Sequence, residues 1–226
     1  NLQMTYQFRS IVGALAAATM LTGAAHATEL NVAYDSQPNS LDAQMSTTLF
    51  TRELSRTFFE TLVTLDGNYR PVPHLAESYE FSEDRKTLTF HLREGVPFHN
   101  GDTMKAEDVV ASMQRWFAVN SRARRFFEGS TIEATDDSTV VLTMPKASVD
   151  TLYVLGSWNS AAIMPKEIVE SADKTGVSEF VGTGPYKFVE WKQDQYIHVT
   201  KFDDYQSLEG PASGFTGTKE AKVDDI

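Results

Sequence analysis

Four of the five histidines in this 226-residue chain have the clearest potential for metal or proton chemistry: His74, His91, His99 and His198. Metal sites place histidines at short, fixed spacings, such as the two histidines of an H-E-x-x-H helix. None of the four falls into such a spacing, and His91 alternates with apolar neighbours in a pattern typical of a surface position. The sequence therefore predicts no metal site and no cofactor.

Motifs for nucleophilic and nucleotide chemistry are incomplete. The segment Gly156-Ser157-Trp158 lacks the second glycine of a nucleophile elbow. The segment Gly182-Thr183-Gly184 begins a dinucleotide-binding motif, but Lys187 stands where the third glycine belongs. Neighbouring carboxylates such as 107–108 and 203–204 are typical of solvated helix ends and turns. These patterns argue against an enzyme, and a secreted hydrolase is a disfavoured alternative.

Aromatic and cationic side chains give a second kind of candidate, a ligand-contacting surface. Arginines at 122, 124 and 125 stand beside Phe126. A charge run of this kind is usually a solvated face, but Arg125 and Phe126 could also present a cation and a ring to a ligand. Trp158, in a Gly-Ser-Trp-Asn segment, also has two interpretations: it could belong to the core or contact a ligand.

The N-terminal residues predict a compartment. Residues 1–27 contain a single charged residue, Arg9, then an apolar run over 11–21, then Ala25-His26-Ala27. This order is typical of a secretory signal peptide cleaved after Ala27, and the run is too short to span a bilayer. The chain has no cysteine, hence no lipid attachment site and no disulfide. We expect a soluble periplasmic protein that is not anchored to the membrane.

Composition and charge limit the classes of molecule that this protein could bind. The chain has 20 basic and 31 acidic residues. Without Arg9, the part after residue 27 has 19 basic and 31 acidic residues, a net charge of −12. Such a balance argues against nucleic acid or an anionic membrane as partner. The remaining 199 residues are enough for a sizeable core.

Apolar periodicity predicts the elements that would position these side chains in a mixed α/β fold. Residues 87–92 alternate polar and apolar types, which predicts a strand with Leu88, Phe90 and Leu92 on one buried face. A helix is expected from about Leu49 to Leu62, and another from about Thr103. Strands are expected at 30–34, twice within 132–144, and as a hairpin over 186–191 and 195–202.

Two longer segments resemble the family 5 extracellular solute-binding proteins, which include receptors for dipeptides, oligopeptides, glutathione and nickel chelates. The first consists of PHLAESYEFSED at 73–84, TLTFHLREGVPFHNGD at 87–102 and AEDVV at 106–110. The second is GTGPYKF at 182–188 with Trp191, followed by KFDDY at 201–205. The resemblance covers most of residues 30–226.

The resemblance implies a fold and its divisions. Family members are α/β proteins of two lobes that close on ligand by a hinge, with an extra subdomain inserted in the first lobe. Residues 28–60 and 166–226 would form the core of the first lobe, and residues 61–165 the inserted subdomain. Residues 223–226 match the start of the strand that crosses to the second lobe. We therefore expect a first lobe only, with the second lobe missing.

The resemblance also implies a ligand-contacting segment and partners. Met45, Ser46, Thr47, Thr48 and Leu49 occupy the place where relatives run extended along a bound ligand, although an ordinary loop is an equal interpretation. The implied function is the substrate-binding component of an ABC importer, a monomer that delivers peptides to an inner-membrane permease. A receptor for a nickel chelate, glutathione or another small solute is the alternative, and a periplasmic interaction protein is a third class. With one lobe absent, we expect weak peptide binding or none.

Overall fold

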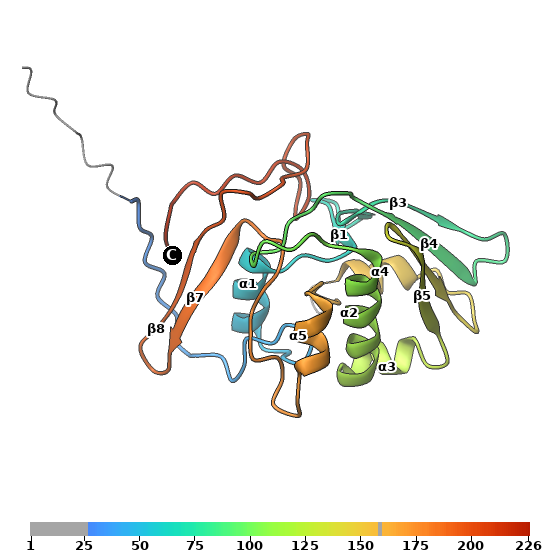
Figure 1. The fold of residues 1–226 in the computed structure, drawn as a ribbon, viewed down its shortest axis with the longest axis horizontal. Coiled ribbons are helices and arrows are strands. Elements are labelled where there is room, and N and C mark those ends of the chain that lie inside the picture. The colour runs from blue at the N-terminus through green and yellow to red at the C-terminus, as the bar shows by residue number, and fades with distance from the viewer. Residues whose placement is uncertain (1–26, 158–159) are drawn as a thin grey trace, which may run out of the picture.

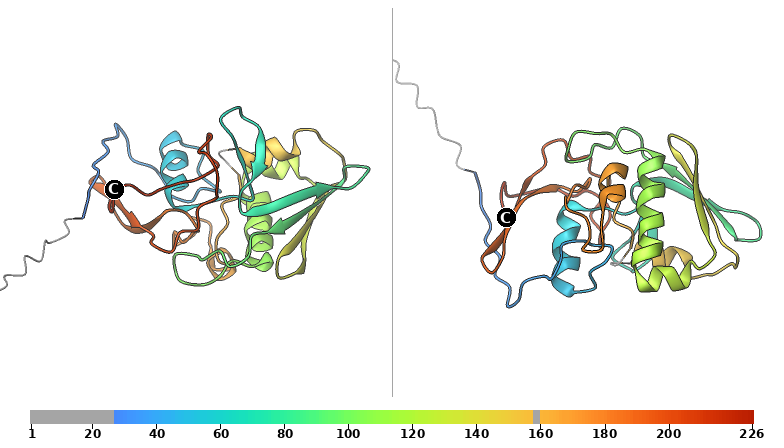
Figure 2. Two further views of the ribbon diagram at one scale, coloured as in Figure 1. Left: turned by 90° about the horizontal axis from the view of Figure 1, so that it is seen from above. Right: turned by 60° about the horizontal axis from the view of Figure 1, so that its bottom comes forward.

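The computed structural model describes residues 27–157 and 160–226, and Figures 1 and 2 show how its elements are arranged. The predicted signal peptide, apart from Ala27, and Trp158 lie outside the described residues. The helices are α1 (Leu49–Phe58), α2 (Ala106–Val119), α3 (Ser121–Phe126), α4 (Thr151–Gly156) and α5 (Lys166–Ser171). The strands are β1 (Val63–Leu65), β2 (Pro71–Pro73), β3 (Ala76–Phe81), β4 (Thr87–Leu92), β5 (Thr131–Asp136), β6 (Thr139–Thr143), β7 (Tyr186–Lys192) and β8 (Tyr196–Lys201).

A four-stranded antiparallel sheet in the order β3-β4-β6-β5 holds the larger core, with α2 packed against it. The alternation in β4 has the predicted result, because Leu88 and Phe90 are fully buried and Leu92 is 3% exposed. Trp116 of α2 joins the same core. Figure 1 shows this sheet at one end of the molecule, with α2 beside it. The mixed α/β fold that the sequence predicts is confirmed.

A smaller core gathers around α1, α5 and the β7–β8 hairpin, at the other end of the molecule in Figure 1. Phe58 lies at its centre, fully buried, and packs edge-on against Phe59 and Phe188. The hairpin confirms the prediction for 186–202, and its turn contains Asp194 with a positive φ of 61°. The predicted division into residues 61–165 and the flanking segments stays a prediction.

Asp108 connects the beginnings of two helices. Its carboxylate accepts from the backbone N–H of Lys105 at 2.8 Å, which caps α2, and from the N–H of Lys166 at 2.8 Å, where α5 begins. Burial raises the pKa of Asp108, against these two hydrogen bonds, which lower it. The helix expected from Thr103 begins three residues later, because Met104 N donates to Val96 O at 2.9 Å and keeps this stretch extended.

Two other element predictions were wrong. The helix expected to reach Leu62 ends at Phe58, because Phe59 adopts an extended conformation and the Leu62 carbonyl pairs with the backbone of residues 74 and 76. No strand forms at 30–34 among the described residues. Only the start of this segment is paired: Leu30 N donates to Asp225 O at 2.9 Å, while Val32 is 54% exposed.

The end of the chain lies between β8 and the first described residues. Val199 and Ile226 exchange backbone hydrogen bonds of 2.9 and 3.0 Å, so 224–226 extend the β7–β8 sheet. On the opposite side, Asp224 N donates to Thr28 O at 2.8 Å, and Thr28 N donates to the Asp224 carboxylate at 2.7 Å. Segments almost two hundred residues apart are therefore paired, as Figure 1 shows.

Candidate functional site

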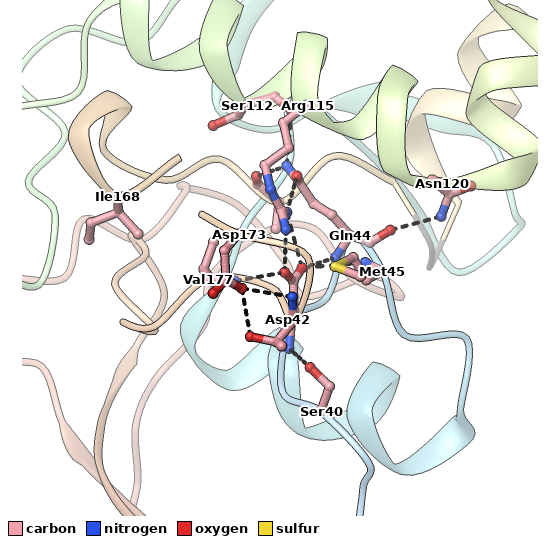
Figure 3. Close-up of polar contacts among 12 residues, drawn as sticks. Ser40, Asp42, Gln44, Met45, Ser112, Arg115, Asn120, Ile168, Asp173 and Val177 are labelled. Atoms are coloured by element: carbon pink, nitrogen blue, oxygen red, sulfur yellow. Dashed lines mark hydrogen bonds and ion pairs between the residues drawn. The ribbon is translucent and has the colours of Figure 1, made fainter. Parts of the chain in front are cut away.

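A buried ion pair fixes the loop that contains the predicted ligand segment. Asp42 is 1% exposed, and Arg115 of α2 approaches it with both guanidinium nitrogens, at 2.6 and 3.2 Å (Figure 3). Paired N–H donors match the geometry of a carboxylate and give a strong, oriented contact. The loop is thereby bound to a helix that is more than seventy residues away in the sequence.

Gln44 extends this cluster and is fully buried. Its amide donates to the carbonyls of Ser112 and Ala162, at 3.0 and 2.9 Å, and its side-chain oxygen accepts from Arg115 at 2.8 Å. Its backbone carbonyl accepts from the Asn120 amide at 3.0 Å. All hydrogen-bonding groups of the Gln44 side chain are used, which leaves the loop little freedom to move.

The far side of Asp42 is closed by backbone. Its carboxylate accepts from Gln44 N at 3.0 Å and from Val177 N at 3.1 Å. Gly176 lies against it with φ of 121°, and a Cβ there would come within 2.9 Å of the Asp42 carboxylate. Glycine is therefore required at 176 both by its backbone conformation and by this close approach.

The predicted ligand segment follows directly. Ser46 N donates to Asp42 O at 2.9 Å, and Thr48 is the N-cap of α1, its hydroxyl accepting from Thr51 N at 3.4 Å. Thr47 and Leu49 are exposed, whereas Met45, Ser46 and Thr48 are half-buried. Within the described residues, neither the N–H nor the C=O of Thr47 has a hydrogen-bond partner. A short stretch of free backbone is thus displayed on a rigid base.

A second buried polar cluster surrounds Glu60, which is 3% exposed. Its carboxylate accepts from Tyr205 at 2.8 Å and from Thr183 at 2.9 Å, and it contacts His74 at 3.1 Å and Lys219 at 3.3 Å. Burial alone would raise the pKa of Glu60, but His74, Lys219 and Tyr205 together hold it well below its usual range. Glu60 is therefore ionised.

His74 differs from its neighbours because one of its nitrogens is unsatisfied. Nε2 faces Glu60, whereas Nδ1 is buried and has no hydrogen-bond partner among the described residues. Burial lowers the pKa of His74 despite the attraction of Glu60, and nearby Lys219 and Arg93 lower it further. A neutral imidazole with one open nitrogen lines a cavity of about 140 Å³.

That cavity is bounded by segments from several parts of the chain. Its walls come from α1 and the residues after it, from the end of α4, and from the loop over 214–219. The lining residues are Ala43, Ser55, Arg56, Phe59, Glu60, Thr61, Thr64, His74, Gly156, Ser157, Ser160, Ala162, Gly214, Phe215 and Lys219.

The residues singled out from the sequence are not brought together in one cavity. Ala43 lines the 140 Å³ cavity, but none of Met45 to Leu49 does, so their role stays a prediction. Arg125 is exposed at the end of α3, while Phe126 packs against the larger core. A larger cavity of about 460 Å³ lies between residues 30–38 and the β7–β8 hairpin. None of the site residues predicted from the sequence is in its lining.

Sequence reasoning missed the Glu60 cluster. Its members are separated by up to 159 positions, and His74 was one of four histidines without a common spacing. Within residues 27–157 and 160–226, no three His, Asp or Glu side chains are grouped so as to hold a metal ion. In the same residues, no helix has the length and apolar character needed to cross a bilayer.

Solved structures with the same fold place this chain among the periplasmic binding proteins. It resembles AgaA from A. tumefaciens R10, in complex with agropinic acid, at 34% identity and a TM-score of 0.66, over 75% of this chain and 35% of that one. It resembles DppA from Helicobacter pylori, in complex with the peptide STSA, at 28% identity and a TM-score of 0.64, over 78% of this chain and 39% of that one.

Comparison of the sequence with known families and proteins establishes the family of this chain. Residues 70–226 match the bacterial extracellular solute-binding proteins, family 5 Middle, and the chain belongs to this family. It is 30% identical over 89% of its length to the glutathione-binding protein GsiB of Pectobacterium atrosepticum, covering 40% of that protein. It is 32% identical over 76% of its length to the dipeptide-binding protein of Escherichia coli K12, covering 37% of it. The chain thus spans about two fifths of these relatives.

Proposed function

We propose that this chain forms the ligand-contacting first lobe of the substrate-binding component of an ABC importer. Its ligand is a short peptide or a small solute of similar size, and it delivers this ligand to an inner-membrane permease from the periplasm. Membership of the solute-binding family supports this proposal, as do the ligands of the similar proteins, which are dipeptides, glutathione and a tetrapeptide.

The observation that carries the proposal is the free backbone at Thr47. This residue is exposed, has no backbone partner among the described residues, and follows a loop held by the Asp42–Arg115 pair. A peptide that lies along residues 46–48 could pair its own N–H and C=O groups with this segment. Backbone pairing gives affinity that does not depend on side chains.

Closure over the ligand would need more surface than this loop provides. Small-molecule sites typically bury about 70–90% of the ligand, whereas a single exposed segment covers one side of it. We therefore expect the chain by itself to bind peptides more weakly than micromolar, which corresponds to less than about 8 kcal/mol of binding free energy.

Nuclear magnetic resonance of the secreted product of the 226-residue chain tests this proposal. Titration with trialanine and trivaline is expected to shift the amide signals of residues 46–48 by similar amounts at millimolar concentration. Trialanine with N-methylated peptide bonds is the matched control and is expected to shift them much less. Equal shifts with the methylated peptide, or shifts confined to other surfaces, would contradict backbone pairing at this segment.

A further inference from the structure

The 140 Å³ cavity contains a cation without a counter-ion. Arg56 lies on α1, half-buried, and its guanidinium stacks on the ring of Phe215 at 3.6 Å. No acidic side chain of the described residues forms an ion pair with it. Burial, and to a smaller extent the charge of Arg52, lower the pKa of Arg56 to about 10, and the nearby charge of Glu53 offsets only part of this shift. A partly desolvated charge without a partner is unfavourable, and an anion entering the cavity would relieve this cost.

A second cation lies on another wall of the same cavity. The ammonium of Lys219 contacts Glu60 at 3.3 Å and His74 at 3.2 Å, and its side chain is 27% exposed. A lysine has three N–H donors, so at least one remains free after these two contacts. Arg56 and Lys219 contribute two positive charges and Glu60 one negative charge, which leaves one positive charge uncompensated.

His74 leaves one further polar group of the cavity unsatisfied. Its side chain is 4% exposed and lines the cavity, yet Nδ1 has no partner. Because Nε2 faces the ionised Glu60 and carries the ring proton, Nδ1 is an acceptor, which a water molecule or a hydroxyl of a ligand can satisfy but a carboxylate cannot. Three serine hydroxyls also lie in the lining, of which Ser55 and Ser157 already donate to the carbonyls of Arg52 and Val154. The cavity thus combines free N–H donors from Arg56 and Lys219 with one unused acceptor nitrogen and a net positive charge.

We propose that this cavity is a subsite for a carboxylate group of the transported solute, held by the guanidinium of Arg56 and the ammonium of Lys219. The inference rests on the proposed solute-binding function and gives it a chemical class, an acidic solute. Guanidinium and carboxylate groups form paired hydrogen bonds, and the ring of Phe215 keeps the guanidinium plane oriented. Ala43 of the loop also lines the cavity, so the subsite adjoins the loop that leads to Thr47.

Charge and size favour a carboxylate over a phosphate. One uncompensated positive charge matches a monoanion, whereas a phosphate monoester carries about two charges at neutral pH. Glu60, ionised on the wall of the cavity, would repel the second charge. A volume of about 140 Å³ corresponds to roughly five water molecules of liquid, enough for a carboxylate with one or two methylene groups.

The test uses glutarate as the probe, because three methylene groups separate its two carboxylates and one can enter the cavity while the other stays in solvent. The neutral glutaramide and inorganic phosphate are the controls, and the protein is the secreted product of the 226-residue chain. Binding is followed by the side-chain Nε–Hε resonance of Arg56 and by calorimetry. We expect glutarate to shift this resonance with a dissociation constant at least tenfold lower than that of glutaramide or phosphate. Arg56→Gln is expected to weaken glutarate binding at least tenfold.

Arg85→Gln is the matched control, because Arg85 also stacks on a phenylalanine, Phe81, at 4.3 Å, but on a distant surface of the larger core domain. This variant is expected to bind glutarate like the parent. Circular dichroism and thermal unfolding of both variants show whether each is folded. If Arg56→Gln fails to fold, Lys219→Gln tests the same site, and it is also expected to weaken glutarate binding at least tenfold.

The outcomes separate this inference from the proposed function. Peptide shifts at residues 46–48 without any glutarate effect on Arg56 would overturn the carboxylate subsite and leave peptide binding standing. Glutarate binding that depends on Arg56, without peptide shifts, would support the subsite and count against peptides as the ligand. Equal affinity for glutarate and glutaramide, or tighter binding of phosphate, would overturn the assignment to a carboxylate.

Discussion

Two buried ionic clusters lie close to the same loop but differ in how completely they are satisfied. In the first, Asp42 and Arg115 are paired through two contacts, and the neighbouring Gln44 uses all its hydrogen-bonding groups. In the second, Glu60 is fully bonded, but His74 has an open nitrogen beside a cavity. A closed network of this kind fixes structure, whereas an open one leaves groups available to bind something else.

The largest effect is expected from breaking the closed cluster. Arg115→Met would leave the Asp42 carboxylate buried without its cation, which typically costs about 3–5 kcal/mol of unfolding free energy. Urea unfolding at pH 7 measures this change. Arg124→Met, at an exposed site on α3, is the control and is expected to change stability by less than about 0.5 kcal/mol. A loss below about 1 kcal/mol for Arg115→Met would show that this cluster does not hold the loop rigidly.

A smaller effect is expected from the open cluster. Glu60→Gln removes a carboxylate bonded to charged and neutral donors, which costs about 1–3 kcal/mol, and solvent that reaches Lys219 reduces the loss. The effect depends on pH. The pKa of Glu60 in the folded state lies below its ordinary value of 4.5, so its contribution is present above that pH and is lost as the pH falls toward the folded value.

The pH dependence provides the decisive measurement for Glu60. The difference in unfolding free energy between the parent and Glu60→Gln is expected to be constant above pH 5 and to shrink between about pH 4.5 and 3. Glu53→Gln, which alters a solvent-accessible carboxylate on α1, is expected to show little difference at any pH. If the difference for Glu60→Gln were the same at pH 7 and pH 3, Glu60 would not be the ionised centre of the cluster.

The smallest effect concerns the segment that lies above the closed cluster. Thr48→Ala removes the N-cap of α1, a contact of 3.4 Å to Thr51 N, and is expected to cost about 0.5–1 kcal/mol. Thr47→Ala, at the exposed neighbour, is expected to change stability by less than about 0.5 kcal/mol while leaving the backbone free. A large loss of unfolding free energy from Thr47→Ala would mean that this exposed side chain has a structural role.

Local pattern was sufficient for elements that bury one face. The alternation at 87–92 predicts β4, and the helical spacing of Val109, Val110, Met113 and Phe117 predicts α2, because burial of a single face decides both. The residues at 30–34 have a similar alternation but no strand, since pairing also needs a neighbour. Periodicity indicates which side chains are buried, but it does not indicate whether a partner strand is present.

Neither polar cluster could be predicted from spacing. Asp42 and Arg115 are 73 residues apart, and Glu60 and Lys219 are 159 apart, so their contacts depend on how α2 and the loop over 214–219 pack. The family resemblance did place Met45 to Leu49 directly after the loop that contains Asp42, because a resemblance preserves the order of segments along the chain. It contained no sign of Arg56, whose significance comes from its place on the wall of a cavity built by distant parts of the chain.

The pairing of Thr28 with Asp224 has a consequence for the order of folding. This contact closes 196 residues of chain, a separation that makes it one of the slowest contacts to form, because loop-closure entropy grows with length. While the polypeptide is being synthesised from its N-terminus, residues 28–30 have no partner until 224–226 have been made. Residues 28–30 are therefore paired into the sheet only late in folding, when the two ends of this long loop meet.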